Sequence, residues 1–271
     1  MYKANFKVDQ DKCIGCGQCL NVCPGNMVGG DVLRMEDNHP VMVDETSFGW
    51  KGCWRCQHCL AICPTGAISI FGIDPEQVSP KPNDSIKEDL NRLMRYRRSC
   101  RDFKKEEVDK KTIDEIVEAV ANVPTGGNNN RLEFSVIYTR DAMRKLFEIV
   151  RAHNKQLSLL DTNDEDDFSE MRLYDASHLF IAHKPVGDRF RDGDYVEINI
   201  ASAYFELLAN AYGLGTILST YCAELLSSNK EALKFLEIPE DHTFMTVVGF
   251  GYPKYPYARG IDKIRKTHKI D

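Results

Sequence analysis

The residues best suited to chemistry in this chain are eight cysteines in two short runs. In each run, two-residue gaps separate the first three cysteines, a three-residue gap precedes the fourth and a proline follows it; the runs are 13–24 and 53–64. The short gaps let the chain wrap three thiolates around one metal centre, while the longer gap and the proline direct the fourth cysteine outward. Because three ligands do not close such a site, each run needs a ligand from elsewhere. A pair of zinc ribbons is the alternative, since C-x2-C pairs also hold tetrahedral zinc.

The double run is similar to that of bacterial two-cluster ferredoxins, in which the fourth cysteine of each run ligates the other cluster. This resemblance implies two [4Fe-4S] clusters with crossed ligands. The first would be held by Cys13, Cys16, Cys19 and Cys63, and the second by Cys53, Cys56, Cys59 and Cys23. His58 lies inside the second run and is expected to be a polar neighbour of a cluster, not a ligand.

Composition and charge limit the class of protein and the kinds of partner that the chain can have. The chain has 271 residues with 42% hydrophobic content, which is enough for a sizeable core and one or two domains. Its net charge of -6 argues against nucleic acid as the main partner. No apolar run reaches the ~18 to 20 residues of a membrane-spanning helix, and no N-terminal stretch resembles a signal peptide. We therefore expect a soluble, cytoplasmic protein with no membrane partner, in which Cys100 and Cys222 are small buried residues.

The sequence predicts two domains. Residues 1–72 are typical of a ferredoxin-like unit, with short strands at 6–8 and 67–71 and a hairpin between the cysteine runs. Residues 73–84 contain three prolines and no apolar periodicity, which predicts a linker. Residues 85–271 form the second domain.

The second domain mixes helical and strand patterns, which predicts an α+β fold. Ser85 is expected to open the first helix through a capping box, Thr112 the second, and Ser228 to cap the last. The acidic segment 161–170 is expected to be a solvated loop, with a lid as the alternative. Helices are predicted at 85–96, 112–123, 141–153, 195–212 and from 228, and strands at 134–138, 179–182, 216–219 and 244–250.

A second candidate site begins at Arg97. Its guanidinium, those of Arg98 and Arg101, and the Ser99 hydroxyl suit a phosphate group, because arginine offers a planar fork of donors. A solvated basic face is the alternative. Neither a G-x-G-x-x-G after a strand nor a P-loop is present, so the sequence supports no dinucleotide or P-loop site.

With the segment Pro124–Asn130 beside it, the second domain resembles the FMN-dependent nitroreductase family, in the branch that carries a fused two-cluster ferredoxin. The matching segments are 97–103, 124–128, 174–178 and 263–265, and the resemblance covers about residues 85 to 266. The chain departs from the family at Asn130–Leu132, where Gln-Pro-Trp is usual, so the family does not indicate its substrate range.

The resemblance implies the residues that bind FMN and no protein nucleophile. Arginines would hold the phosphate and ribityl chain, Arg101 would lie near flavin N1 and O2, and 124–128 would reach the flavin from the other subunit of a homodimer. The implied set is Arg97, Arg98, Ser99, Arg101, Pro124, Thr125, Gly126, Gly127, Asn128, Arg172, Leu218, Ser219, Thr220, Lys263 and Arg265.

These observations predict an iron-sulfur flavoprotein oxidoreductase. It would pass electrons from the two [4Fe-4S] clusters to FMN and on to a small nitro, quinone or other unsaturated acceptor. Its donor would be reduced ferredoxin or NAD(P)H. The alternatives are an electron-transfer or docking module without a substrate of its own, and a reductive dehalogenase on the same scaffold. None of the seven histidines forms a metal-type pair in the sequence.

Overall fold

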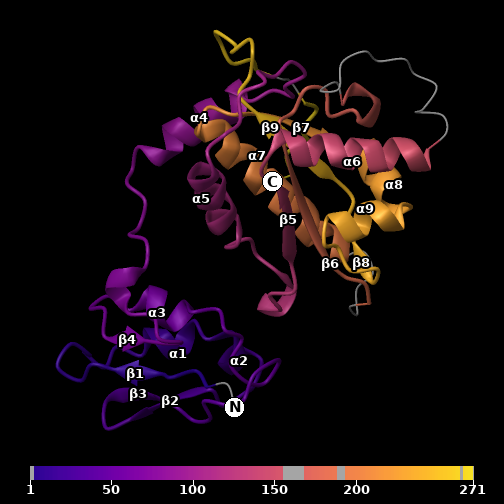
Figure 1. The fold of residues 1–271 in the computed structure, drawn as a ribbon. Helices are drawn as coiled ribbons and strands as arrows, with labels where there is room; N and C mark the ends of the chain where they lie inside the picture. Colours follow the sequence, from indigo (N-terminus) through magenta and orange to yellow (C-terminus); the bar gives the residue numbers. More distant parts are fainter. Residues whose placement is uncertain (1–2, 155–167, 188–192, 263–264, 271) are drawn as a thin grey trace. The chain divides into compact units, whose positions relative to one another are not determined.

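The structure, a computed structural model, describes residues 3–154, 168–187, 193–262 and 265–270. The chain forms two compact units, Met1–Asn83 with Thr125–Asn130, and Asp84–Pro124 with Arg131–Asp271. Figure 1 shows the elements of both. Among the described residues, no helix combines the length and the apolar character that crossing a bilayer requires.

The first unit is built from two small antiparallel pairs of strands. β1 (Lys7–Val8) pairs with β4 (Ile68–Ser69), as expected for the strands that flank the cysteine runs. β2 (Leu33–Glu36) and β3 (His39–Met42) form the expected hairpin. Its turn consists of two residues, Asp37 and Asn38, which both adopt positive φ angles, 44° and 66°.

Short helices and turns hold the cysteine runs of this unit. α1 (Gln18–Asn21) and α3 (His58–Ile62) each start within a run, and α2 (Pro24–Met27) starts at the proline that ends the first run. Four cysteines share a small core with aliphatic side chains. This core contains Cys19, Cys23, Cys53 and Cys59 together with Ala4, Val32, Leu33, Leu60, Ile68 and Ile70. The 3-10 turns η1 (Pro75–Gln77) and η2 (Gly126–Asn128) also belong to this unit.

The second unit is an antiparallel sheet with helices on both faces. The strand order is β5-β6-β9-β7, and β8 pairs with the end of β6. Its strands are β5 (Glu133–Ile137), β6 (His178–Pro185), β7 (Gly215–Ser219), β8 (His242–Thr243) and β9 (Val247–Gly251). Its helices are α4 (Ile86–Tyr96), α5 (Lys110–Val120), α6 (Arg140–His153), α7 (Gly193–Ala211), α8 (Thr220–Ser227) and α9 (Lys230–Phe235), with the 3-10 turn η4 (Ser169–Met171). The expected α+β class is confirmed.

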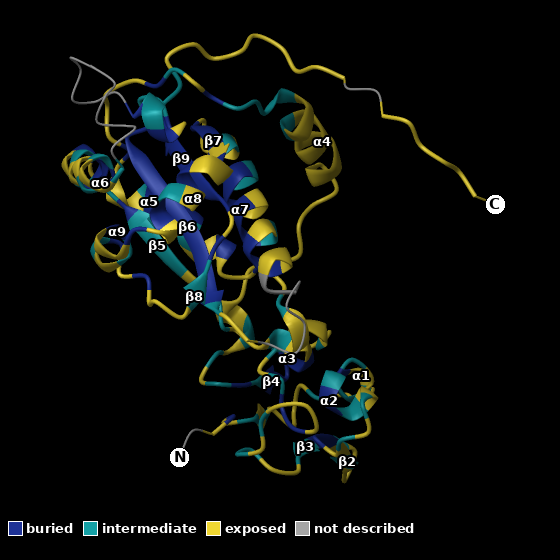
Figure 2. Ribbon diagram, turned by 90° about the vertical axis from the view of Figure 1, so that its right-hand side faces the viewer, coloured by how far each residue is buried: buried dark blue, intermediate teal, exposed yellow. Residues whose placement is uncertain are grey.

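The central strand β6 explains why both faces are covered. Its side chains alternate between two apolar clusters: Leu179 and Ile181 pack with α6, α8 and α9, whereas Phe180 and Ala182 pack with α5 and α7. Phe180 stacks on Phe205 of α7 with ring centroids 4.1 Å apart. In Figure 2 the central strands β6 and β9 are accordingly dark blue and the edge strand β5 is mostly teal, while the helices carry exposed residues on their outer sides.

Several helix starts differ from the sequence-based expectation. α5 begins at Lys110, not at Thr112, because the Asp109 carboxylate accepts the Thr112 amide and caps the helix. At α4, the Ser85 side chain makes no cap hydrogen bond. α9 is capped by Asn229, one residue after the predicted Ser228, and α8 was not predicted. Cys100 and Cys222 are buried, as expected. Residues 161–167 of the acidic segment lie outside the described residues.

Candidate functional site

The cysteines of the first unit form two groups that mix the two runs. Cys13, Cys16, Cys19 and Cys63 surround one hollow of ≈ 20 Å³, so the fourth cysteine of the second run lies with three from the first.

Cys23 belongs correspondingly with the second run. It acts electrostatically on Cys53, Cys56 and Cys59, an effect that requires its sulfur to lie near all three. Two glycines allow this approach, because a Cβ on Gly25 would lie only 2.5 Å from the carbonyl oxygen of Gly52. Gly25 follows Cys23 closely and Gly52 precedes Cys53, so this backbone contact brings the second group together.

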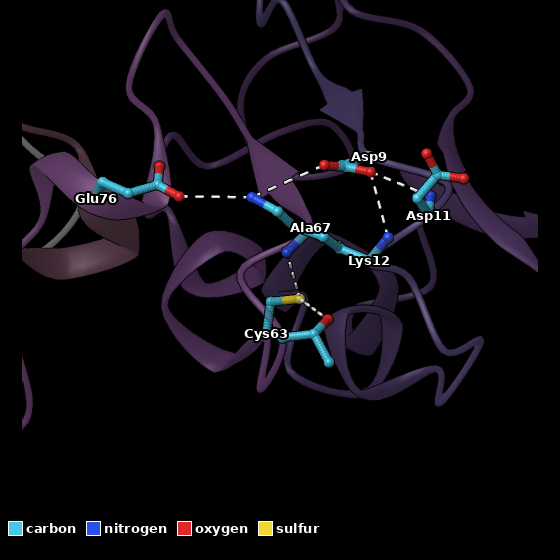
Figure 3. A network of polar contacts seen from close by, with 7 residues as sticks. Asp9, Asp11, Lys12, Cys63, Ala67 and Glu76 are labelled. Atoms are coloured by element: carbon cyan, nitrogen blue, oxygen red, sulfur yellow. Dashed lines mark hydrogen bonds and ion pairs between the residues drawn. The ribbon is translucent and has the colours of Figure 1, made fainter.

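Backbone donors orient Cys63, the cysteine that crosses to the first run (Figure 3). Its Sγ accepts the Ala67 amide at 3.2 Å and lies 3.7 Å from the Thr65 hydroxyl. Ala67 also accepts the Asp9 amide through its carbonyl, at 2.8 Å, and so ties Cys63 to the segment that enters the first run. Burial opposes ionisation of this thiol, but the combined donors outweigh it and lower the pKa of Cys63.

A salt-bridge network closes the same corner of the unit. The Lys12 ammonium lies 3.8 Å from Asp9 Oδ2 and 3.5 Å from Glu76 Oε1, and Asp9 Oδ1 accepts the Asp11 and Lys12 amides (Figure 3). All these carboxylates are exposed, so the network orients the loop more than it stabilises the fold.

Four further thiols of the two runs suit metal ligation and little else. Burial raises the pKa of Cys19, Cys53 and Cys56, and raises that of Cys59 to about 12. Thiols so placed are inert as nucleophiles, whereas cationic iron would stabilise them as thiolates. The crossed groups and their apolar surroundings therefore fit two iron-sulfur clusters.

The predicted phosphate-binding residues lie around a hollow of ≈ 570 Å³ in the second unit. Arg98, Ser99 and Arg101 line it together with Gly215 and the segment 255–258. The arginine segment is held beside β7, because Ser99 bridges to Thr216 and the Cys100 amide donates to the Thr216 carbonyl at 2.7 Å. Gly215 is required at this contact, since a Cβ there would lie 2.7 Å from Cys100 Sγ.

Arg97 is engaged differently from its neighbours. Its Nη1 donates to Glu206 Oε1 of α7 at 2.9 Å, and both side chains are largely buried. Glu206 Oε1 also accepts the Thr216 hydroxyl at 3.4 Å. Arg97 thus links α7 to the strand beside the hollow. Arg98 donates from its guanidinium to the carbonyls of Arg97 and Arg95.

Four further predicted residues gather at the other end of β7. Ser219 Oγ donates to the Met171 carbonyl at 3.1 Å and accepts the Cys222 amide at 3.0 Å. Arg172, which follows Met171, lies over the Tyr221 ring, 5.8 Å from its centroid. Leu218 and Thr220 flank Ser219 and are exposed. At ~3.3 Å per residue, Gly215 and Ser219 lie about 13 Å apart, a separation that a flavin ring with its ribityl phosphate can span.

The segment Thr125–Asn130 belongs to the compact unit that holds the cysteines, although its flanks Pro124 and Arg131 belong to the other unit. Asn128 Nδ2 donates to the Trp54 carbonyl at 2.8 Å. Gly127 and Asn128 adopt positive φ angles, 59° and 49°, which glycine and asparagine tolerate. Gly127, Asn128 and Asn129 line a hollow of ≈ 380 Å³ with Trp50, Cys53, Trp54 and Arg55.

The C-terminal residues Lys263 and Arg265 were also predicted to contact the phosphate. Lys263 lies outside the described residues, and Arg265 is exposed. Sequence reasoning missed Glu206 and Trp54. Glu206 lies on α7, and its partner Arg97 is 109 residues away in the sequence, so no local pattern marks Glu206. Trp54 lies between Cys53 and Cys56, and the spacing of the cysteines indicates nothing about the contacts of the residues between them.

Comparison with known proteins adds the family. The nitroreductase family matches residues 94–252, and the 4Fe-4S dicluster domain matches residues 12–67. The chain belongs to the nitroreductase family. This confirms the expected class of enzyme, an FMN-dependent oxidoreductase, with a ferredoxin-like domain for two [4Fe-4S] clusters.

Relatives of the first domain include ferredoxins. The chain is 33% identical over 76 residues to an uncharacterized ferredoxin of Methanocaldococcus jannaschii, covering 28% of this chain and 90% of the relative. It is 38% identical over 66 residues to a ferredoxin of Thermococcus litoralis, covering 23% of this chain and 92% of the relative.

Solved structures similar to the second domain include nitroreductases with bound FMN. The one from Desulfitobacterium hafniense DCB-2 has a TM-score of 0.54 and 20% identity, with 70% of this chain and 100% of that chain covered. The one from Bacteroides fragilis NCTC 9343 has a TM-score of 0.53 and 18% identity, with 70% and 98% covered. At this identity the likeness shows the fold.

Proposed function

We propose that this nitroreductase-family protein is an iron-sulfur flavoprotein that receives single electrons at its two clusters and delivers them through FMN to a small nitro, quinone or other unsaturated acceptor. One observation carries the proposal. Of the segment expected to line the flavin, Pro124–Asn128, all but Pro124 is part of the cluster-bearing unit. There the Asn128 side chain donates to the carbonyl of Trp54, which lies in the sequence between two predicted ligands of the second cluster. A docking module without its own substrate would not need this link.

The proposed flavin site follows β7 from end to end. Near Gly215 the Arg98 guanidinium and the Ser99 hydroxyl would bind the phosphate, and Arg101, which lines the same hollow, would bind the polar edge of the flavin ring. At Ser219 the exposed Leu218 and Thr220, with Arg172, would bound its other end. Bound FMN would supply the exchange between one-electron and two-electron chemistry. Arg101 would stabilise negative charge on the ring.

Arg97 takes a positioning role in this proposal. Its ion pair with Glu206 fixes the start of the arginine segment against α7, so that Arg98 and Ser99 face the hollow. Arg265 and Lys263 would contact the phosphate, and Pro124 to Asn128 would line the flavin from the partner subunit.

A second chain fits an apolar surface of the second unit. Side chains of α4, α5 and α7 line a groove of ≈ 550 Å³ that includes Leu90, Leu93, Tyr204 and Leu208. Val196, also on α7, is 55% exposed. A homodimer would cover this apolar surface. We propose that the same dimer completes each flavin site.

Measured FMN affinity tests the proposed site. Arg98→Ala and Arg101→Ala should each weaken FMN binding about ten- to a hundredfold, because each removes a charge-assisted contact worth ~1.5 to 3 kcal/mol. Arg265→Ala should act in the same direction, while iron and sulfide content stay unchanged.

Arg92→Ala is the matched control, because Arg92 is an exposed arginine of α4 that lies 3.9 Å from Glu88. It should bind FMN as the unaltered protein does. Unchanged FMN affinity in all three test variants would remove the assignment of these arginines to the FMN site.

A further inference from the structure

The register of β5, β6 and β8 places four polar side chains on one face of the sheet. Glu133 stands opposite His183, Ser135 opposite Ile181, and His242 opposite Pro185. Because side chains alternate along a strand, these positions share the face that carries Ile181 and packs against α6 and α9. The three strands lie side by side in Figure 1. Neither the cluster sites nor the proposed flavin site uses these residues.

The two histidines on this face touch. His183 Nδ1 lies 2.8 Å from His242 Nδ1, and one oxygen of Glu133 completes a group of ligand atoms within 4.8 Å of one another. His183 is buried, His242 is half-buried and Glu133 is exposed. The sequence shows no such pair, because 59 residues separate the two histidines.

A hydrogen-bond chain fixes the tautomer of His183. Ser135 Oγ donates its proton to the Leu236 carbonyl at 2.8 Å, so it can only accept from His183 Nε2, 3.0 Å away. His183 therefore carries its proton on Nε2 and turns the Nδ1 lone pair toward His242. A metal-binding histidine is commonly held by such a bond from its other ring nitrogen.

The His183 ring is also kept neutral, as a metal ligand must be. Burial, with a smaller effect of the neighbouring His242, lowers the pKa of His183 to about 4. Its lone pair is therefore available at neutral pH.

We propose that His183, His242 and Glu133 form a binding site for a divalent transition-metal ion, with Zn²⁺ the best match. Two imidazoles and one carboxylate are a three-ligand set that zinc accepts with a fourth position open. Without metal, the His242 Nδ1 proton lies between the rings as a hydrogen bond. On binding, His242 changes tautomer and both Nδ1 lone pairs turn to the ion, so the rings lose no net proton.

The geometry needs a small adjustment. Ligand bonds of ~2.0 to 2.1 Å at a tetrahedral angle place two nitrogens about 3.3 Å apart, against 2.8 Å here. Half-buried His242, at the end of the short β8, can move by this half ångström while His183 stays fixed. Glu133, Ser135 and His183 also line an open hollow of ≈ 650 Å³ at the edge of the sheet, which gives the ion an entry path and its fourth ligand a place.

Zinc titration of the intact, cluster-loaded protein under anaerobic conditions tests the site. In competition with a chromophoric chelator, the protein should bind one Zn²⁺ per chain without losing iron or sulfide. His242→Ala should abolish this binding and Glu133→Gln should weaken it. Ser135→Ala should weaken it about 10- to 100-fold, because the tautomer of His183 is then no longer held. His153→Ala, an exposed histidine at the end of α6, should leave it unchanged.

Zinc K-edge absorption identifies the ligands directly. The spectrum should show two imidazoles and oxygen, and no sulfur at ~2.3 Å. Equal zinc affinity in the unaltered protein and His242→Ala, or sulfur around the bound zinc, would overturn the proposal. Failure of the unaltered protein to bind Zn²⁺ would also overturn it and leave an ordinary hydrogen bond between two histidines.

Discussion

At the scale of single residues, crossed cysteine ligation is the feature with the clearest consequences. We propose that the runs at 13–24 and 53–64 exchange their fourth cysteines, and the structure has Cys63 at the hollow of the first run. Small residues at Gly25 and Gly52 and the amide of Ala67 make the exchange possible. When one cysteine is substituted, the lost cluster should therefore be the one that its spatial group holds, and not the one held by the other cysteines of its run.

Paired cysteine variants test the exchange. The unaltered protein should hold roughly eight iron atoms per chain, from two cubanes. Cys63→Ala and Cys13→Ala should each leave about four, and the two together should still leave about four, since both belong to one cluster. Cys13→Ala combined with Cys53→Ala should remove nearly all iron.

Cys100→Ala, outside the runs, should keep the full iron content and serves as the control. The exchange would be wrong if Cys13→Ala and Cys63→Ala together removed both clusters. Iron and acid-labile sulfide counts on anaerobically purified protein decide between the outcomes.

Residues that act through distant partners were beyond prediction from the sequence. Regular spacing marked the cysteines, and the chemistry of arginine and serine marked Arg98, Ser99 and Arg101, which do line one hollow. Arg97 looked equivalent to its neighbours in the sequence, but its ion pair with Glu206 sets it apart. That difference depends on the packing of α7, which no local pattern reveals.

At the scale of elements, the period of the apolar residues predicted most helices and strands. The positions at which helices start were predicted less accurately. β6 was predicted over 179–182 and extends over His178–Pro185, because its ends carry histidines, lysine and proline in place of aliphatic residues. α8 was missed because it follows β7 without a loop, and Ser219 is both the last residue of the strand and the cap of the helix.

The cap of α9 provides a direct test of such a boundary. Asn229 Oδ1 accepts the amides of Glu231 and Ala232 at 3.1 and 3.0 Å, and the residue is buried. Asn229→Ala should lower the stability of the second unit by about 0.5 to 2 kcal/mol. In thermal unfolding this corresponds to a melting temperature lower by about 2 to 4 °C per kcal/mol.

Ser228→Ala is the matched control, since Ser228 is exposed and its hydroxyl donates to carbonyls at the end of α8. It should melt close to the unaltered protein. A larger loss from Ser228→Ala than from Asn229→Ala would restore the boundary first predicted from the sequence.

At the scale of the whole molecule, the proposed homodimer follows from apolar surface that the described part of one chain leaves uncovered. Tyr204 on α7 is 45% exposed and lines the groove between α4, α5 and α7. Sedimentation of the loaded protein should give twice the mass of one chain. Tyr204→Glu should shift this toward a single chain and lower the bound FMN, because a charge would be buried at the contact.

Lys230→Glu, which introduces the same side chain on the exposed surface of α9 and changes the charge by two units instead of one, should stay dimeric. A monomeric unaltered protein that keeps one FMN per chain would contradict the composite site. The sequence predicted the dimer only through the family resemblance, since a buried helix and a dimer helix share one apolar pattern.

The most direct measurement follows electrons from donor to FMN by rapid mixing. FMN accepts a hydride from a nicotinamide without iron, so two one-electron centres on the same chain indicate a one-electron donor of low potential. Reduced ferredoxin should therefore reduce FMN in the intact protein faster than NADH or NADPH does. Cys63→Ala should slow this reaction while leaving the nicotinamide rates unchanged. If NADPH reduced FMN as fast as ferredoxin did, and the loss of a cluster changed neither rate, the proposed electron route would be wrong.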